Sequence, residues 1–126
     1  MNTWETLIFK YINKKKDEEC CGLLAKQGDK TVFFPCKNYA EDKSNNFLIS
    51  PDDWIKIEDK ANIIGIVHSH PKGDLNMSEG DIKKCVSLDY PFYLFSIEKQ
   101  DYKIFYPRDY KWKKQKLFYM ENLLNF

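Results

Sequence analysis

Apolar residues recur at helical spacing near the start of the chain, and a strand pattern follows them. After Thr3, which suits an N-cap, the helical stripe consists of Trp4, Leu7, Ile8, Tyr11 and Ile12. This spacing predicts an amphipathic helix over residues 3–16. Residues 20–26 and 31–37 have the composition of strands, and the glycine-containing turn 27–30 between them predicts a β-hairpin.

The middle of the chain begins with a polar segment and continues with three predicted elements. Residues 38–45 predict a loop, and residues 47–49 predict a short strand after it. Ser50 as an N-cap and Pro51 at the first helical position then predict the start of a second helix. The continuous apolar run within residues 62–67 suits a central strand that is buried on both faces.

The last elements complete an α/β arrangement. A third helix is predicted over residues 78–88, and strands are predicted at 92–97 and 102–106. Together the elements predict a mixed β-sheet flanked by helices. Because 43% hydrophobic residues in a chain of 126 can furnish one core, we expect a single domain over residues 1–126, with its core at about 3–106.

Charge and hydropathy argue against two classes of partner. The formal net charge of +1 offers no electrostatic reason to expect nucleic acid or an anionic membrane as the main partner. No apolar stretch approaches the roughly 20 residues that cross a bilayer, and the N-terminus lacks the apolar region of a signal peptide. We therefore expect a soluble protein that is made in the cytoplasm.

Residues 107–126 interleave lysines with aromatic residues. Such a pattern can contact nucleic acid through charge and stacking. The interpretation that we favour is a C-terminal helix with its lysines in water and an apolar stripe packed on the sheet, formed by Leu117, Met120, Leu123 and Leu124. A docking surface for a protein partner is the next alternative.

The only two histidines of the chain lie in the run His68-Ser69-His70-Pro71, which Ser78 and Asp81 follow. At the end of a strand, the side chains at positions i and i+2 point in the same direction, so both imidazoles can bind one ion. With Ser78 as an N-cap, Asp81 lies in the first helical turn and its carboxylate faces back toward the loop. Two histidines and one aspartate are the three protein ligands that a catalytic zinc site uses. The alternative is a pair of surface histidines followed by an ordinary capping box.

A glutamate further upstream can border the same pocket. Glu19 directly precedes the small, apolar run Cys20-Cys21-Gly22-Leu23-Leu24. Together with His68-x-His70-Pro71, Ser78 and Asp81, this residue resembles the signature of the JAMM (MPN, Mov34) metalloprotease family. The resemblance extends over about residues 18–106 and is most specific between His68 and Asp81.

Within that family, the chain is most similar to the domain found in lambda-type phage tail-assembly proteins. The segments that carry this similarity are Glu19-Cys20-Cys21-Gly22, Phe34-Pro35-Cys36-Lys37-Asn38, Phe47 ahead of Ser50-Pro51-Asp52-Asp53-Trp54, Val67-His68-Ser69-His70-Pro71, and Tyr90-Pro91-Phe92. Those proteins often carry a second, cell-wall-cleaving domain of the NlpC/P60 type, for which 126 residues leave no room. We therefore expect a stand-alone version or the first domain of something longer.

The resemblance implies the cytidine-deaminase-like JAMM/MPN fold and a zinc-dependent hydrolysis. By analogy with the family, His68, His70 and Asp81 hold Zn²⁺, Glu19 is the general base, and Ser78 donates a hydrogen bond to the oxyanion. The substrate is expected to be a peptide or isopeptide bond in a protein, with phage tail proteins as partners. The expected location is the host cytoplasm or the virion tail.

Several alternatives stand beside this interpretation. The same fold can serve as a non-catalytic scaffold in a phage tail complex. A zinc deaminase would need His-x-Glu and Pro-Cys-x-x-Cys, and a serine hydrolase of the Gly-x-Ser-x-Gly type would need that motif, none of which occurs.

The four cysteines, at positions 20, 21, 36 and 85, form no Cys-x-x-Cys pair and predict reduced thiols. Cys20 and Cys21 suit buried, small apolar positions. A cysteine thiolate that joins the histidines on zinc remains an open alternative.

Overall fold

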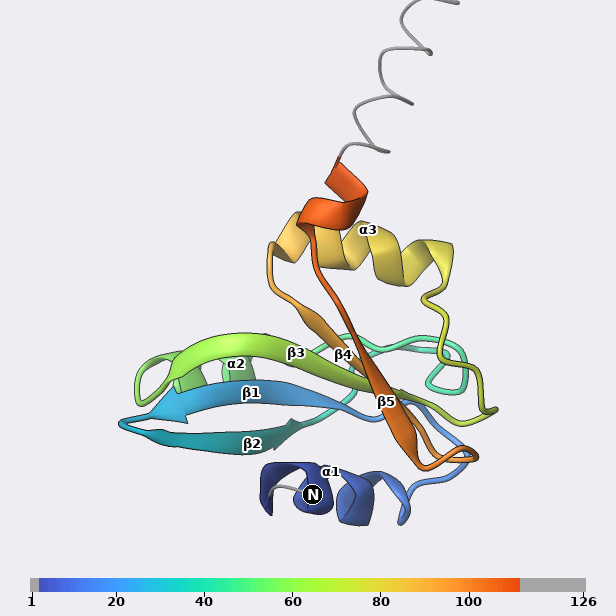
Figure 1. The fold of residues 1–126 in the computed structure, drawn as a ribbon, viewed down its shortest axis with the longest axis horizontal. Helices are drawn as coiled ribbons and strands as arrows, with labels where there is room; N and C mark the ends of the chain where they lie inside the picture. The colour runs from blue at the N-terminus through green and yellow to red at the C-terminus, as the bar shows by residue number, and fades with distance from the viewer. Residues whose placement is uncertain (1–2, 112–126) are drawn as a thin grey trace, which may run out of the picture.

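The computed structural model describes residues 3–111, in which one β-sheet is covered by helices (Figure 1). The elements are α1 (Thr3–Ile12), β1 (Cys21–Gln27), β2 (Lys30–Cys36), α2 (Pro51–Glu58), β3 (Asn62–His70), α3 (Glu79–Leu88), β4 (Phe92–Ser96) and β5 (Asp101–Phe105). A helical turn at 108–111 follows β5. None of the helices within this range has the length and apolar character that crossing a bilayer requires.

The sheet has the strand order β2-β1-β3-β4-β5. β3 and β4 are parallel, whereas the other neighbouring strands are antiparallel. A parallel pair needs a crossover connection, and α3 provides it between β3 and β4. The predicted mixed β-sheet flanked by helices is therefore confirmed.

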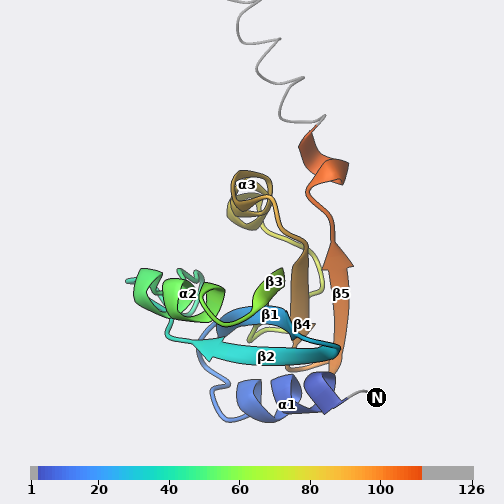
Figure 2. The same cartoon turned by 90° about the vertical axis from the view of Figure 1, so that its left-hand side faces the viewer.

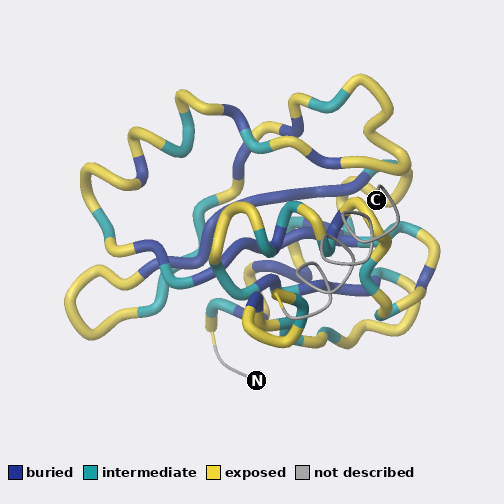
Figure 3. Tube along the Cα trace, turned by 90° about the horizontal axis from the view of Figure 1, so that it is seen from above, coloured by how far each residue is buried: buried dark blue, intermediate teal, exposed yellow. Residues whose placement is uncertain are grey.

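The helices lie on opposite faces of the sheet, with α1 on one face and α2 and α3 on the other (Figure 2). α1 packs its apolar stripe on Leu24, Val67 and Phe95, whereas α2 and α3 cover a core that contains Ile66 and Phe92. Figure 3 shows that the buried stretches of the chain run mainly through the strands. Because side chains alternate along a strand, those of His68 and His70 lie on the same face as that of Ile66, which α2 and α3 cover.

The first helix is shorter than the predicted range of 3–16 and ends at Ile12. Ile12 is the last apolar residue of the stripe and is buried. The next residues offer no apolar side chain that a further turn would bury, and the backbone N–H of Lys15 instead bonds the carbonyl of Ile12 in a tighter turn.

Two strand predictions also need correction. β3 continues to His70, three residues beyond the apolar run, because the parallel ladder with β4 pairs His68 with Leu94 and His70 with Ser96. The expected strand at 47–49 is not formed within the described residues, where Ile49 makes only an isolated bridge to Asn38.

Other predictions from the pattern hold. The hairpin, the second and third helices and the last two strands are present with small shifts of their ends. All four cysteines are free, as expected, and Cys20 and Cys21 are buried as predicted; Cys36 and Cys85 are buried as well. The apolar stripe predicted for the C-terminal helix lies outside the described residues, and the single domain over 1–126 stays a prediction.

Gly22 provides a test of how closely β1 and β2 approach. A Cβ atom at this position would lie 2.5 Å from the carbonyl oxygen of Phe34 and 2.5 Å from Cε1 of Phe33. Because the Phe34 oxygen belongs to the backbone of β2, we expect Gly22→Ala to lower the free energy of unfolding by about 1–3 kcal/mol or more in urea titrations.

Gly80→Ala in α3 is the matched control, since a Cβ atom there meets no atom closer than 3.8 Å. Alanine favours helices by up to about 1 kcal/mol over glycine, so this variant should equal or exceed the wild-type stability. Equal unfolding midpoints for the two variants would contradict the close approach.

Candidate metal centre

Two histidines project from the end of β3 onto the face covered by α2 and α3. His68 is fully buried and His70 is partly buried. Their ring centroids lie 5.3 Å apart. The Nε2 atoms of both rings converge on one oxygen of Asp81, with Oδ2 at 3.3 Å from His68 and 3.1 Å from His70.

Asp81 reaches the histidines because a capping box orients it at the start of α3. The Oγ of Ser78 accepts a hydrogen bond from the backbone N–H of Asp81 at 3.1 Å. In return, Oδ2 of Asp81 accepts one from the backbone N–H of Ser78, also at 3.1 Å. The carboxylate therefore faces back toward the end of β3, as the sequence predicts.

Glu19 lies directly before β1 and is buried beside the same residues. The segment between β2 and α2 holds its backbone, since the carbonyl of Lys43 accepts from its N–H at 2.6 Å and Nδ2 of Asn38 donates to its carbonyl at 2.8 Å. One ligand atom each from Glu19, His68, His70 and Asp81 lies within 4.8 Å of the others. The structure thus brings together the four titratable residues that the sequence singles out, with Ser78 beside them.

Burial and mutual contacts set the charges of this group. Burial raises the pKa of Glu19 to about 7, and the charge of Asp81 adds to this rise. Burial lowers the pKa of His68. For Asp81, burial alone would raise the pKa. Its contacts with His68 and His70 outweigh burial and hold the pKa of Asp81 below its ordinary value. A neutral imidazole and an ionised carboxylate are the forms that bind metal ions.

The pKa of His70 shifts in the opposite direction to that of His68. Burial would lower the pKa of His70, yet its contact with Asp81 outweighs burial and raises it. Because a metal ion binds the neutral imidazole, metal binding here competes with protonation of His70.

Several polar atoms of the group have no hydrogen-bond partner among the described residues, namely Oε1 of Glu19 and both ring nitrogens of His68. The Nε2 of His68 lies within ion-pair distance of Asp81, but the two groups are not aligned as a hydrogen bond. Buried polar atoms without partners are costly, so a ligand that accepts a lone pair from Oε1 of Glu19 and from one ring nitrogen of His68 fits here.

Imidazole nitrogens and carboxylate oxygens match the ligand preference of zinc, and the group can therefore hold a metal ion. It contains no cysteine, so nothing within residues 3–111 supports a thiolate ligand.

A cleft of about 630 Å³ opens beside the group. Glu19, His70 and Ser78 contribute to its wall. His68 and Asp81 lie behind that wall and are almost fully buried. A substrate in the cleft would therefore contact Glu19, the exposed edge of His70, and Ser78.

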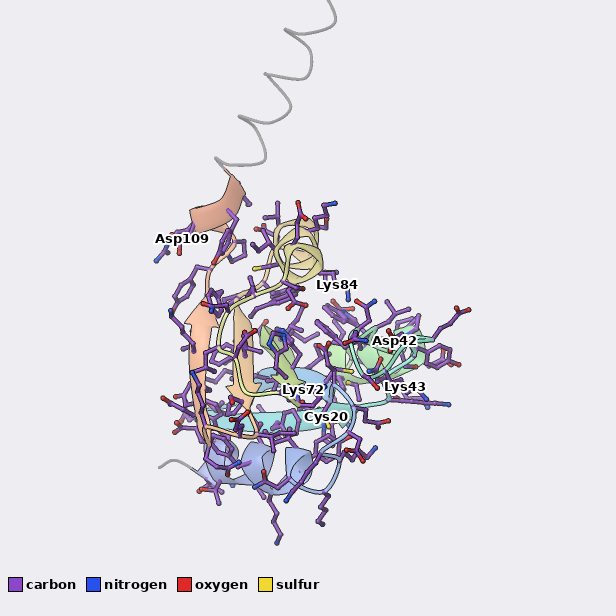
Figure 4. All side chains as sticks on the ribbon, turned by 90° about the vertical axis from the view of Figure 1, so that its right-hand side faces the viewer. Cys20, Asp42, Lys43, Lys72, Lys84 and Asp109 are labelled. Carbon is purple, nitrogen blue, oxygen red and sulfur yellow. The ribbon has the colours of Figure 1, made fainter. Side chains whose placement is uncertain are left out.

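Other residues around the group were not singled out from the sequence. The carbonyl of Asp74 accepts a hydrogen bond from Nδ1 of His70 at 3.2 Å, and Asn38 holds Glu19. Figure 4 shows Lys84 on α3, facing the segment that carries Asp42 and Lys43. Asn38 lies in a segment that carries the family resemblance, but its spacing does not link it to the group, and the sequence contains no signal that links Asp74 or Lys84 to it.

Comparisons with known proteins agree with this architecture. The family described as prokaryotic homologs of the JAB domain matches residues 3–108. Tail tip assembly protein K of Escherichia phage N15 is 33% identical over 90 residues, which make up 71% of this chain and 37% of that protein. The protein of the same name from Escherichia phage lambda is 41% identical over 46 residues, or 36% of this chain and 23% of that protein. The chain thus matches 37% of the length of one relative and 23% of the length of the other.

Solved structures share the fold. A protein from Desulfitobacterium hafniense superposes with a TM-score of 0.66 at 17% identity, covering 82% of this chain and 78% of that protein. A JAB1/MPN domain protein from Archaeoglobus fulgidus gives a TM-score of 0.55 at 16% identity, covering 83% and 85% of the two chains. At these identities the likeness establishes the fold alone.

The capping box makes a prediction about stability. Ser78→Ala removes the oxygen that accepts from the backbone of Asp81, and we expect a loss of about 1 kcal/mol in the free energy of unfolding. Ser78→Thr keeps an oxygen in place and should stay near the wild type. Urea titrations in buffer with a metal chelator check both variants. An unchanged unfolding midpoint for Ser78→Ala would contradict a stabilising role of the capping box.

Proposed function

The chain belongs to the family of prokaryotic homologs of the JAB domain, and from this membership we propose that it is a zinc-dependent peptidase or isopeptidase that cleaves an amide bond in a protein. The observation that carries the proposal is the convergence of Glu19, His68, His70 and Asp81 beside a cleft whose wall includes Glu19 and His70. A purely structural zinc site usually has four protein ligands that close it. Here, three residues suffice as ligands and leave the glutamate for chemistry.

The side chains of His68, His70 and Asp81 would hold the ion. Bound there, zinc would supply Lewis acidity to a substrate carbonyl and make water more acidic. Asp81 is fixed by the capping box and His70 by its bond to the carbonyl of Asp74, so two of the three ligands are oriented in advance.

Glu19 would move the proton. Its Oε1 has no hydrogen-bond partner in the described structure, so this oxygen is available to accept a proton from the attacking water. The water oxygen then bonds the carbonyl carbon. As the carbon–nitrogen bond breaks, Oε1 of Glu19 returns that proton to the leaving amine. The two hydrogen bonds to its backbone keep this side chain at the cleft.

Ser78 would stabilise the oxyanion. Its Oγ accepts from the backbone of Asp81, which leaves the hydroxyl hydrogen for donation into the cleft that Ser78 lines. A single donor of this kind is worth on the order of 3 kcal/mol in the barrier. Capping and oxyanion binding can therefore be combined in one side chain.

We place this hydrolysis in phage tail assembly, with tail proteins as substrates or partners. The support is the similarity to two tail tip assembly proteins. The host cell or the virion tail is then the location of the reaction.

One observation favours a second candidate, a non-catalytic assembly module. Oδ2 of Asp81 already contacts both histidines, so the three side chains form a polar network that can stabilise the fold without an ion. Zinc binding and cleavage separate the two candidates.

We expect one Zn²⁺ per chain, and its addition should raise the melting temperature because an ion that binds only the folded state stabilises it. Asp81→Asn removes a ligand and should abolish most of this rise. Asp52→Asn is the matched control, since Asp52 is exposed on α2. Calorimetric titration and melting curves check the prediction, which fails if the wild type shows no zinc-dependent shift or if both variants respond equally.

Glu19→Gln should reduce cleavage by about 10²- to 10⁴-fold while zinc remains bound, because the amide cannot accept the proton. Glu18→Gln is the control, since Glu18 is half-exposed and pairs with Lys15 at the surface. Both are assayed by mass spectrometry on a peptide library and on tail proteins from a phage that encodes a related assembly protein. Zinc binding without cleavage by the wild type would favour the assembly module.

A further inference from the structure

The two histidines differ in what holds their rings. Nδ1 of His70 donates to the carbonyl of Asp74, which is the usual way in which a protein orients a metal-binding histidine. Nδ1 of His68 has no hydrogen-bond partner among the described residues, although the side chain is fully buried. Something other than a hydrogen bond must orient the ring of His68.

Aromatic rings enclose His68 instead. The ring of Phe47 stacks on the imidazole with a centroid distance of 4.6 Å and an interplanar angle of 21°. Phe92 meets the imidazole edge-on at 5.4 Å and 69°. Phe47 is itself buried, so a rotated imidazole would collide with a ring that has little room to move.

The backbone on both sides of Phe47 is fixed by hydrogen bonds. Asn38 donates to the carbonyl of Asn46 at 2.9 Å and accepts from the N–H of Leu48 at 3.0 Å. Lys84 donates to the carbonyl of Phe47 at 2.5 Å, and its ammonium lies 4.3 Å from the centre of the phenyl ring. Because Asn38 also holds Glu19, one segment supports both the proposed base and a proposed ligand.

We propose that Phe47 is a positioning residue for metal binding. Its stacked ring holds the imidazole of His68 so that Nε2 faces Asp81. For His70, the hydrogen bond that Nδ1 donates to the carbonyl of Asp74 performs this task. This inference rests on the proposed zinc site. It adds that affinity for the ion depends on a phenyl ring that has no ligand atom.

Phe47→Leu tests the proposal, because it keeps an apolar side chain and removes the stacked ring. We expect the dissociation constant for Zn²⁺, measured by competition with a chromophoric chelator, to rise roughly 10- to 100-fold, the usual effect of losing support for a ligand. Phe95→Leu is the matched control. Phe95 is fully buried in the core on the α1 face and stacks on Tyr102 at 4.7 Å, so the same change is made away from the site.

The control should bind zinc as tightly as the wild type, even though it also loses a buried ring. Equal weakening by both variants would mean that general stability sets the affinity and would overturn the proposal. Wild-type affinity for Phe47→Leu would overturn it as well.

A metal-free measurement separates this inference from the proposed function. Imidazole nitrogen NMR spectra of zinc-free protein should show broadened or multiple signals for His68 in Phe47→Leu, with the His70 signals unchanged. If the wild type binds no zinc, the proposed function fails, and these spectra still decide whether Phe47 orients the ring. A single, wild-type-like His68 signal in the variant would contradict the proposal.

If Phe47→Leu does not fold, Lys84→Met provides a second test of the proposal. It leaves the phenyl ring and removes the hydrogen bond and the ammonium that hold it. We expect weaker zinc binding than for Lys83→Met, whose lysine is exposed on the same helix. Equal affinities for the two variants would count against the proposal.

Discussion

The parallel pairing of β3 with β4 is the constraint on which the candidate site depends. The ladder continues past the apolar run and keeps His68 and His70 in extended backbone, where both side chains face the same side. A parallel pair also requires a crossover, and the crossover places the first turn of α3 beside the end of β3. The same pairing therefore aligns two imidazoles and brings the carboxylate of Asp81 to them.

The segment between β2 and α2 is the second support of the site. It forms almost no regular structure, yet it holds the backbone of Glu19 and covers His68 with Phe47. The buried amide of Asn38 organises this segment through hydrogen bonds to four backbone groups. Such a fully satisfied polar side chain fixes an irregular backbone, since each of its groups would be costly to leave unpaired.

The site combines unsatisfied polar atoms with a well-packed apolar surrounding. His68 lies fully buried against aromatic rings, and neither of its ring nitrogens has an aligned partner in the described structure. In natural proteins, buried polar groups without partners occur mainly at functional sites, where a bound ligand supplies the missing interaction.

The sequence by itself determined the features that rest on local interactions. Helical spacing, the glycine turn, the capping box of Ser78 and Asp81, and the alternation that aligns His68 with His70 involve only neighbours along the chain. From these, the mixed sheet and the grouping of His68, His70 and Asp81 could be predicted, whereas the resemblance to the JAMM signature added Glu19.

Only the tertiary structure decided that the first helix ends at Ile12, that residues 47–49 form an isolated bridge in place of a strand, and that Asn38 and Phe47 support the site. These features depend on contacts between distant parts of the chain, such as the bond that joins Lys84 to Phe47 across 37 positions. Asn38 and Phe47 lie in segments that resemble the family, but their supporting roles could not be predicted, because the packing of the whole fold determines which residues they contact.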